Sequence, residues 1–381
     1  MSFSSLGLSH PLLQAVAAQN YTQPYPIQKE VIPAILKGKD VLGIARTGSG
    51  KTAGFVLPIL EMIKDARSTR NRHVKALVLV PTRELAVQVA EVFQVLGEKL
   101  PKRVKILAVY GGVSVNPQMM ALSGTDILVA TPGRLLDLVS SKAVHLSDVQ
   151  MLVLDEADKM LDLGFKEEMG EIFAKLPEKR QNMLFSATLG RDVNDIKDIL
   201  LHDPVVIEVT EEVTQNLDQI KQVAYLVEPE RKGLMLRYLI KERDMQQVLV
   251  FVSAVKRADN VVDKLIKNGI EAAAFHSKKS QGGRTDALKK FKSGKLKVLV
   301  ATDLASRGID IQFLPYVINY ELPRSPKDYV HRIGRTGRAE ASGEAISLIC
   351  PEDQHHFKII QKKMGKRVEM IETADLDLKG Y

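Results

Sequence analysis

Short apolar runs separated by mixed polar and apolar segments recur along the whole chain, and this pattern predicts buried strands alternating with helices. In the first half the expected strands lie at 40–45, 76–80, 106–109, 126–130, 151–154, 182–185 and 205–209. In the second half they lie at 248–252, 272–275, 298–302, 316–320 and 345–349. The alternation predicts an α/β fold in which mostly parallel sheets carry helices on both faces.

A polar stretch, residues 210–218, separates the two halves and is the expected linker. We therefore expect one domain at 1–209 and a second at 219–381. The run at 127–131, Ile-Leu-Val-Ala-Thr, is nearly repeated at 298–302 as Val-Leu-Val-Ala-Thr, which favours a duplicated architecture. With 381 residues and 45% hydrophobic content, the chain is long enough to bury two cores.

Composition changes this picture in only a few respects. The net charge of +8 is compatible with a polyanionic partner. The single cysteine, Cys350, ends an apolar run, and we expect a buried thiol in a reducing cytoplasm. No apolar run approaches the roughly 20 residues that a membrane span needs, and no signal-peptide pattern is evident. The expected location is therefore cytoplasmic, with no membrane partner.

The first strand runs directly into the segment 45–52, Ala-Arg-Thr-Gly-Ser-Gly-Lys-Thr, and a helix is expected to begin near Ala53. Glycines let backbone N–H groups surround phosphate oxygens, and a helix N-terminus adds partial positive charge. Lys51 is expected to reach the β- and γ-phosphates, and the Thr52 hydroxyl to ligate Mg²⁺. The predicted phosphate loop consists of Ala45, Arg46, Thr47, Gly48, Ser49, Gly50, Lys51 and Thr52.

Two adjacent carboxylates follow the apolar run 151–154, in the sequence Asp155-Glu156-Ala157-Asp158. In an open α/β sheet, ligands bind at the carboxyl ends of the strands. As the acidic partner of the phosphate loop, Asp155 is expected to hold Mg²⁺ and Glu156 to orient or deprotonate a water molecule. Seen alone, the motif is equally compatible with a strand end followed by a solvated acidic turn.

Hydroxyls, exposed backbone N–H groups and arginines recur after other predicted strands, at 81–83, 111–112 and 131–134. This mixture suits a sugar-phosphate backbone better than base edges, although each segment alone is a common helix cap or turn. Two hydroxyls at 186–188 either relay the state of the carboxylates or form a simple cap. Upstream, Gln28 follows two prolines; its amide suits an adenine edge, or else lies on a surface turn.

The second half has no phosphate loop of its own. It has instead a segment at 302–310 and an arginine-rich segment at 331–338, His-Arg-Ile-Gly-Arg-Thr-Gly-Arg. Arginines at 332, 335 and 338 bring several guanidinium groups within reach of one small target, and the glycines between them favour a close approach to a ligand. A patch of solvated arginines is the alternative.

Together these motifs resemble the DEAD-box RNA helicases of superfamily 2, over nearly the whole chain and in order. Within that family the chain is most similar to the bacterial RhlE-type branch. The resemblance implies two tandem RecA-like domains joined by a short linker, with ATP and Mg²⁺ as cofactors. The catalytic residues that it implies are Lys51, Asp155, Glu156, Arg335 and Arg338, with Thr52 and Asp155 at the metal.

The same resemblance assigns further positions in this sequence. Beyond the phosphate loop, nucleotide contacts are expected from Phe3, Tyr21, Gln28, Gly308 and Asp310. RNA contacts are expected from Pro81, Thr82, Arg83, Gly112, Thr131, Gly133, Arg134, Gln281, Arg284, Thr302 and Asp303. Coupling between the domains is expected from Asp158, Ser186, Thr188 and His331. Tyr25 and Arg46 differ from the residues that are usual at these positions in the family. This leaves the rate of the reaction in doubt, but not the reaction itself.

The implied activity is hydrolysis of ATP when RNA closes the two domains, with separation of short RNA duplexes or remodelling of RNA–protein complexes. Aromatic residues make up 5% of the chain and tryptophan is absent, which argues for backbone recognition of RNA with little sequence specificity. We expect a monomer, with ribosome-assembly or RNA-decay proteins as candidate partners. A DNA-directed translocase of the same superfamily and a nucleotide-gated RNA clamp are the alternatives.

Overall fold

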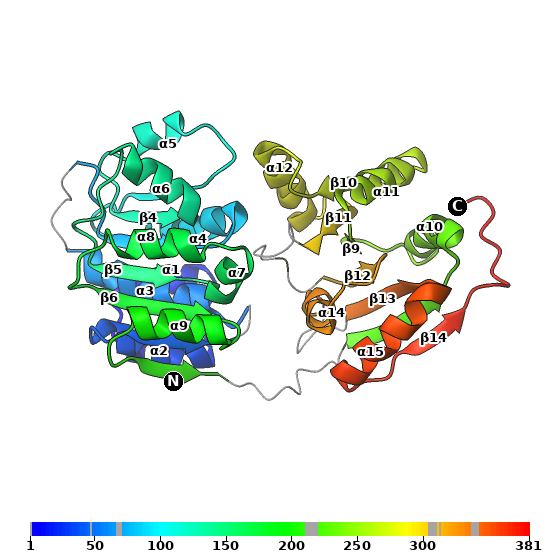
Figure 1. The fold of residues 1–381 in the computed structure, drawn as a ribbon, viewed down its shortest axis with the longest axis horizontal. Coiled ribbons are helices and arrows are strands. Elements are labelled where there is room, and N and C mark those ends of the chain that lie inside the picture. Colours follow the sequence, from blue (N-terminus) through cyan, green and yellow to red (C-terminus); the bar gives the residue numbers. More distant parts are fainter. Residues whose placement is uncertain are drawn as a thin grey trace. The chain divides into compact units, whose positions relative to one another are not determined.

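The computed structural model describes residues 2–45, 48–65, 71–209, 220–303, 311, 314–336 and 343–381. The chain divides into two compact units, Met1–Thr210 and Glu211–Tyr381, and each unit has its own sheet and its own hydrophobic cores (Figure 1). The expected linker at 210–218 lies outside the described residues.

Unit 1 is built on a parallel sheet of seven strands in the order β3-β4-β2-β5-β6-β1-β7. These strands are β1 (Val41–Ile44), β2 (Ala76–Leu79), β3 (Ile106–Val109), β4 (Ile127–Ala130), β5 (Met151–Leu154), β6 (Gln181–Ser186) and β7 (Val205–Glu208). The central strands are buried on both faces, which explains why they read as continuous apolar runs in the sequence.

Helices cover both faces of this sheet (Figure 1). One core joins alternate strand residues such as Val78 and Val153 to α1 (His10–Ala18), α2 (Pro26–Leu36), α3 (Lys51–Ile63) and α4 (Arg83–Gly97). The other joins the intervening residues, such as Leu77 and Leu152, to α6 (Pro132–Ser140), α7 (Ala157–Asp162), α8 (Lys166–Phe173) and α9 (Arg191–Leu200). Two shorter elements complete the unit, η1 (Phe3–Ser5) and α5 (Asn116–Ala121).

Unit 2 has a second parallel sheet of seven strands, in the order β10-β11-β9-β12-β13-β8-β14. These strands are β8 (Ile220–Leu226), β9 (Val248–Val252), β10 (Ala272–Phe275), β11 (Val298–Thr302), β12 (Tyr316–Asn319), β13 (Gly343–Ile349) and β14 (Glu369–Glu372). The expected strands at 248–252, 272–275, 298–302, 316–320 and 345–349 all match, whereas β8 and β14 were not predicted.

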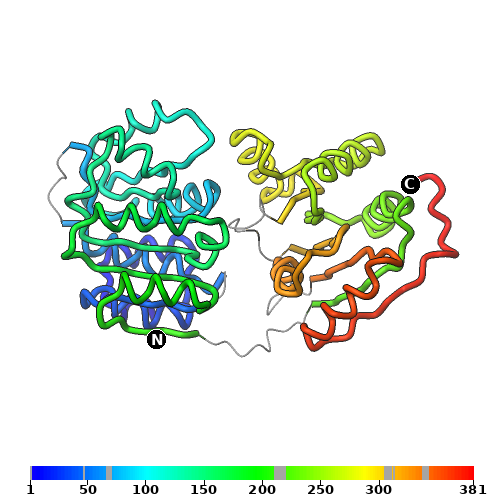
Figure 2. Tube along the Cα trace, in the orientation of Figure 1, coloured from blue at the N-terminus to red at the C-terminus, as the bar shows by residue number. Residues whose placement is uncertain are grey.

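In unit 2, α10 (Lys232–Glu242) and α11 (Val255–Lys267) pack on one face of the sheet. The other face carries α12 (Gln281–Lys292), α14 (Pro326–Ile333) and α15 (Gln354–Met364), with the single turns η2 (Pro229–Arg231) and η3 (Pro351–Asp353) in the connections. The last residues of the chain return toward α10 (Figure 2). There, Arg237 NH2 donates a hydrogen bond to the Tyr381 carbonyl at 2.6 Å.

The two strand orders correspond position by position, so unit 2 repeats the architecture of unit 1. The nearly repeated segments 127–131 and 298–302 fall on β4 and β11, which both lie second from an edge of their sheets. The fold is therefore a tandem pair of parallel α/β domains, as the sequence predicted. In each unit the carboxyl ends of the strands bring the predicted site residues to one edge of the sheet.

Candidate functional site

The phosphate loop lies where β1 gives way to α3 at the carboxyl edge of the sheet in unit 1. Gly48 and Gly50 both have a positive φ, +83° and +85°, which glycine adopts without strain. The helix begins at Lys51, two residues before the expected start. Among the described residues the buried Ser49 Oγ has no hydrogen-bond partner, which suits a loop that binds an anion. Arg46 and Thr47 lie outside the described residues.

Lys51 is a buried cation, with 7% of its surface exposed, at the first turn of α3. Its Nζ donates a hydrogen bond to the carbonyl of Ala45 at the start of the loop. Burial lowers the pKa of Lys51, and the negative charges of Asp155, Glu156 and Asp158 partly offset that effect. The lysine is therefore already placed beside the acidic motif, as the pairing of the two motifs predicted.

Asp155 follows β5 directly and is 3% exposed. Burial raises the pKa of Asp155 to about 6, with a further increase from the charge of Glu156 and an opposing effect from Lys51. Its Oδ1 accepts a hydrogen bond from the backbone N–H of Glu156 at 2.9 Å. A carboxylate desolvated to this degree has a strong requirement for a cation, and this favours a metal or phosphate site over a solvated turn.

Glu156 has left-handed backbone angles, φ 55° and ψ 48°, which are rare for a residue with a side chain. The turn places its carboxylate at the start of α7, where Oε1 accepts a hydrogen bond from Lys159 Nζ at 2.6 Å. The other oxygen, Oε2, is buried and has no hydrogen-bond partner in the part of the chain that the structure describes. One oxygen is thus fixed and the other can accept a proton or a hydrogen bond from a water molecule.

Lys159 is a site residue that the sequence analysis missed. Its spacing of three residues from Glu156 was the available signal, because side chains at i and i+3 meet once a helix starts at Ala157.

Gln28 lies on α2 against the phosphate loop, with 2% of its surface exposed, so the surface-turn alternative does not hold in this structure. Its Nε2 donates to the carbonyl of Gly50 and its Oε1 accepts from the N–H of Tyr25, both at 2.9 Å. Tyr21 is 40% exposed, whereas Phe3 is 5% exposed and packs in the core. The expected contact of Phe3 with the nucleotide stays a prediction, and it requires exposure of a ring that is covered in this structure.

The three residues of unit 1 predicted to couple the domains are in contact with one another. Thr188 Oγ1 donates to Asp158 Oδ2 at 3.1 Å, and the backbone N–H of Thr188 donates to Ser186 Oγ at 3.3 Å. Because Ser186 ends β6, which lies between β5 and β1, this small network stands between the acidic motif and the phosphate loop. Its coupling role stays a prediction.

The predicted RNA residues of unit 1 gather at the other side of the same sheet edge, after β2, β3 and β4. Arg83 NH1 donates to the Gly112 carbonyl at 3.5 Å, and Arg134 NH2 donates to the Val113 carbonyl at 2.9 Å. Thr82 and Thr131 cap α4 and α6, and Pro81 and Gly133 lie beside them. The structure therefore separates the predicted nucleotide residues from the predicted RNA residues along one edge.

In unit 2, Arg332 ties the predicted RNA residue Asp303 to the sheet interior. Its Nε and NH2 bond both carboxylate oxygens of Asp303, at 2.6 and 2.7 Å, and its NH1 donates to Asn319 Oδ1 at 3.1 Å. Asn319 donates to Ser347, which also bonds the hydroxyl of Tyr329. This buried polar network was not predicted.

The other predicted residues of unit 2 lie around that network. Thr302 ends β11 and is 8% exposed, and Arg284 on α12 donates to Gln281 Oε1 at 2.7 Å. His331 is exposed on α14, and Arg335 follows that helix with partial exposure. Gly308, Asp310 and Arg338 lie outside the described residues.

Two family models match this chain: DEAD/DEAH box helicase over residues 25–196, and helicase conserved C-terminal domain over residues 231–340. DEAD-box ATP-dependent RNA helicase CshA of Bacillus cereus is 39% identical over 378 residues, which cover 99% of this chain and 70% of that protein. DEAD-box ATP-dependent RNA helicase RhpA of Helicobacter pylori is 38% identical over 377 residues, covering 99% of this chain and 75% of that protein.

Among solved structures, Dbp5 of S. cerevisiae bound to RNA and ADP BeF3 is similar, with a TM-score of 0.83 and 31% sequence identity. The match covers 98% of this chain and 96% of that one. In the part of the chain that the structure describes, no helix combines the length and the apolar character needed to cross a bilayer. The motifs, the duplicated fold and the identity to these relatives agree, and the chain belongs to the family of DEAD-box ATP-dependent RNA helicases.

Proposed function

We propose that this protein hydrolyses ATP in response to RNA and uses the cycle to separate short RNA duplexes or to displace bound protein. The observation that carries the proposal is the buried triad at one sheet edge of unit 1: the Lys51 ammonium, the desolvated carboxylate of Asp155, and Glu156 with one unpartnered oxygen. Such a combination suits phosphoryl transfer to water, in which catalysis consists of positioning and charge stabilisation.

The donor atoms present fit Mg²⁺. Thr52 and Asp155 supply a hydroxyl and a carboxylate oxygen, and Mg²⁺ prefers oxygen ligands and keeps several waters. Within the described residues, no group of three or more His, Cys, Asp or Glu side chains is arranged to hold a metal ion, which accords with an ion held chiefly by nucleotide phosphates and water. When bound, Mg²⁺ supplies charge neutralisation on the phosphates.

Lys51 would bind the β- and γ-phosphates, exchanging its hydrogen bond to the Ala45 carbonyl for phosphate oxygens. The free Oε2 of Glu156 would orient the attacking water and accept its proton, while Lys159 holds the other oxygen in place. Gln28 and Tyr21 would contact the base, and Gly308 and Asp310 the ribose.

We propose that RNA closes the two units so that Arg335 and Arg338 stabilise charge on the transferring phosphoryl. An arginine supplied in this way is worth roughly 10³ to 10⁵ in rate, or about 4 to 7 kcal/mol. RNA drives closure only if it binds the closed form better than the open form. The clusters around Arg83 and Arg134 in unit 1, and around Arg284 and Asp303 in unit 2, are the proposed RNA contacts.

Several finer assignments complete the proposal. The domains are 1–209 and 219–381 with a linker at 210–218, and the protein is a cytoplasmic monomer that recognises the RNA backbone. Candidate protein partners act in ribosome assembly or RNA decay. The RhlE-type likeness came from motifs alone, and the relatives reported above carry the names CshA and RhpA, so the branch is kept only as a sequence prediction.

The deciding experiment is steady-state ATP hydrolysis without nucleic acid, with single-stranded RNA and with DNA of the same sequence. We expect strong stimulation by RNA alone, and loss of that stimulation in Glu156→Gln. Glu178→Gln, at an exposed carboxylate far along the chain from the motif, is the matched control and should retain full activity.

Two outcomes would replace the proposal. Equal stimulation by DNA would favour the DNA-directed translocase. Tight RNA binding with a non-hydrolysable ATP analogue, without repeated turnover, would favour the nucleotide-gated clamp.

A further inference from the structure

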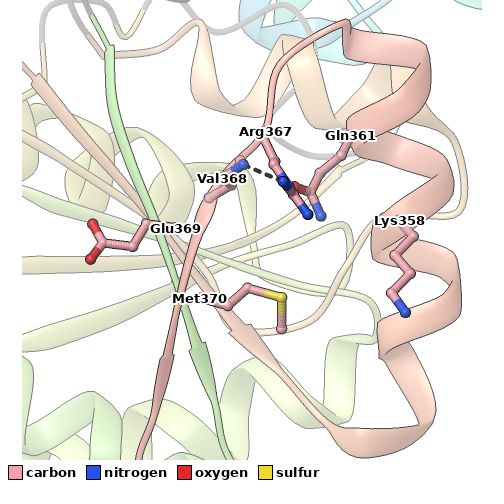
Figure 3. Close-up of a pocket in the computed structure, with 6 residues that line it drawn as sticks. All are labelled: Lys358, Gln361, Arg367, Val368, Glu369 and Met370. Carbon is pink, nitrogen blue, oxygen red and sulfur yellow. Dashed lines mark hydrogen bonds between the residues drawn. The ribbon is translucent and has the colours of Figure 1, made fainter.

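An open groove of about 430 Å³ lies in unit 2 between α15 and the edge strand β14 (Figure 3). It is lined by Lys358, Gln361, Arg367, Val368, Glu369 and Met370. Figure 3 shows the Met370 side chain on the helix side of the strand and Glu369 on the opposite side. Gln361 links α15 to the start of β14, because its Oε1 accepts a hydrogen bond from the N–H of Val368 at 2.8 Å. The groove therefore has an apolar floor and a polar wall.

One side of this groove is a free sheet edge. β14 pairs in parallel with β8, and it ends the strand order of its sheet. Within the described residues no strand pairs with its other edge. An edge of this kind presents backbone N–H and C=O groups to which an extended peptide can add as a further strand.

The surface around the groove is strongly basic. Residues 354–368 contain no Asp or Glu, and Lys358, Lys362, Lys363 and Arg367 are all exposed. In the described part of the chain none of these four side chains forms an ion pair. Unpaired cations at this density favour an anionic partner, whose charges would also steer it to the edge.

Apolar exposure distinguishes between two anionic partners, an acidic peptide and RNA. Met370 on β14 and Ile359 on α15 are 38% and 43% exposed. None of the groove residues is aromatic, so the groove offers no platform for stacked bases. An extended peptide that carries both acidic and apolar side chains on the side facing α15 matches the cations and the floor together.

We propose that the edge of β14 and the groove beside α15 form a docking site for an extended acidic segment of a partner protein, which adds to the sheet as an eighth strand. On the side of the added strand that faces α15, apolar side chains lie beside Met370 and carboxylates pair with Lys358 and Arg367. The predicted RNA residues Gln281, Arg284 and Thr302 belong to α12 and β11, at the opposite end of the strand order. Docking is therefore compatible with RNA bound at those residues.

The test uses the full chain and a short N-acetylated peptide of repeating Glu-Thr-Val-Thr, which places Glu and Val on the same face of an extended strand. It is compared with the same peptide carrying Lys in place of Glu. Binding is measured by fluorescence anisotropy, and the site by amide hydrogen exchange. We expect the Glu peptide alone to bind and to slow exchange at β14. Lys358→Glu with Arg367→Glu should weaken binding by about tenfold or more. Met370→Thr should also weaken binding, because it removes the apolar contact without changing any charge.

The matched control is Lys264→Glu with Lys267→Glu, two exposed lysines on α11 whose reversal changes net charge equally. This control should leave peptide binding unchanged. All variants should retain RNA-stimulated ATP hydrolysis, so the docking proposal and the proposed function are tested separately. Equal binding of the Lys peptide, absence of protection at β14, or protection of β14 by single-stranded RNA instead would each overturn the proposal.

Discussion

Asp155 shows how a single residue can oppose folding while serving a site. Its pKa is raised from 3.8 to about 6, chiefly by burial, so the folded state disfavours the ionised carboxylate. Between pH 4 and pH 6 the folded state binds more protons than the unfolded state, and stability falls as pH rises through this range. Above pH 6 the ionised Asp155 carboxylate exerts its full destabilising effect on the folded state.

We therefore expect Asp155→Asn to raise the free energy of unfolding at pH 7.5 by about 1 to 2 kcal/mol, because it removes a desolvated charge, while abolishing ATP hydrolysis. Chemical denaturation and a hydrolysis assay measure the two effects. Asp162→Asn, at an exposed position, should change neither. If Asp155→Asn instead lowered the free energy of unfolding, the attraction between the Asp155 carboxylate and Lys51 would outweigh the cost of burying that carboxylate.

Gly50 has both a backbone and a packing requirement. Its φ is +85°, and an added Cβ would lie 2.5 Å from Gln28 Nε2 and 2.8 Å from the Tyr25 ring. Gly50→Ala should therefore displace Gln28 and lower nucleotide affinity at least about tenfold, since roughly 1 Å of displacement is costly at a positioned site. Gly38→Ala is the control: its φ is +75°, but a Cβ there meets nothing within 4 Å.

Isothermal titration with ATP distinguishes the two glycine variants. Both should lose about 1 to 2 kcal/mol of stability from the left-handed backbone, and Gly50→Ala alone should lose affinity. Equal affinities in the two variants would contradict the packing role.

Residue by residue, the motifs indicated the centre of the candidate site but not its supports. Lys51, Asp155 and Glu156 lie close together in the structure, as the pairing of the two motifs predicted, and their catalytic roles stay predictions. The left-handed turn at Glu156 and the covered ring of Phe3 depend on packing against distant segments, which no local pattern records. Arg134 was predicted at the RNA face, but its 8% exposure and its bond to Val113 were not.

At the scale of elements, α14 is held to its sheet by polar contacts as well as apolar ones. Tyr329 is fully buried, and its hydroxyl lies 3.2 Å from Ser347 Oγ and 3.4 Å from Gln222 Oε1. Burial raises the pKa of Tyr329 to about 12. The hydroxyl thus remains a neutral hydrogen-bonding group at any pH at which the protein is studied.

Tyr329→Phe should destabilise the protein by about 1 to 2 kcal/mol, because it leaves buried polar partners unsatisfied. It should also weaken RNA stimulation more than ATP binding, because the same network holds Arg332 against Asp303. The control is Tyr316→Phe on β12, which removes a hydroxyl that forms no hydrogen bond within the described residues. Stability is measured by denaturation, and the RNA effect by the RNA concentration at half-maximal hydrolysis. A loss of stability with unchanged RNA dependence would make the network purely structural.

Strands that read as apolar runs were predicted even where they are exposed, as at β7, whereas β8 and β14, which contain charged residues, were missed. The runs at β2, β4, β5 and β9 are continuous apolar segments, so their number and order along the chain followed from the sequence. β14 is an edge strand whose residues are largely exposed. Glu369 and Glu372 at its two ends leave no apolar run from which a strand could be predicted. β8 begins with Ile-Lys-Gln directly after the polar stretch taken as linker. Sheet order could not be derived at all, because it depends on pairings between distant segments.

For the whole molecule, the duplicated architecture implies that each unit can fold without the other, since the cores of unit 1 are made by its own residues. A protein consisting of residues 1–209 should unfold cooperatively and bind ATP through Lys51 and Gln28. It should show no RNA-stimulated hydrolysis, because Arg335 and Arg338 are absent. Thermal denaturation, nucleotide titration and the hydrolysis assay check these outcomes. Stimulated hydrolysis by this fragment would exclude an essential contribution from the second unit.

The position of β1 in its sheet has a consequence for synthesis of the chain. β1 lies between β6 and β7, with Val41 opposite both Met183 and Val205. The loop that follows it leaves the ribosome early, yet the strands that hold it are among the last of unit 1 to be made. At about 5 to 20 residues per second, the interval is on the order of ten seconds or more. Throughout that time the nascent protein carries an apolar strand with two open edges and no nucleotide site, so occupancy by ATP can begin only when this unit is nearly complete.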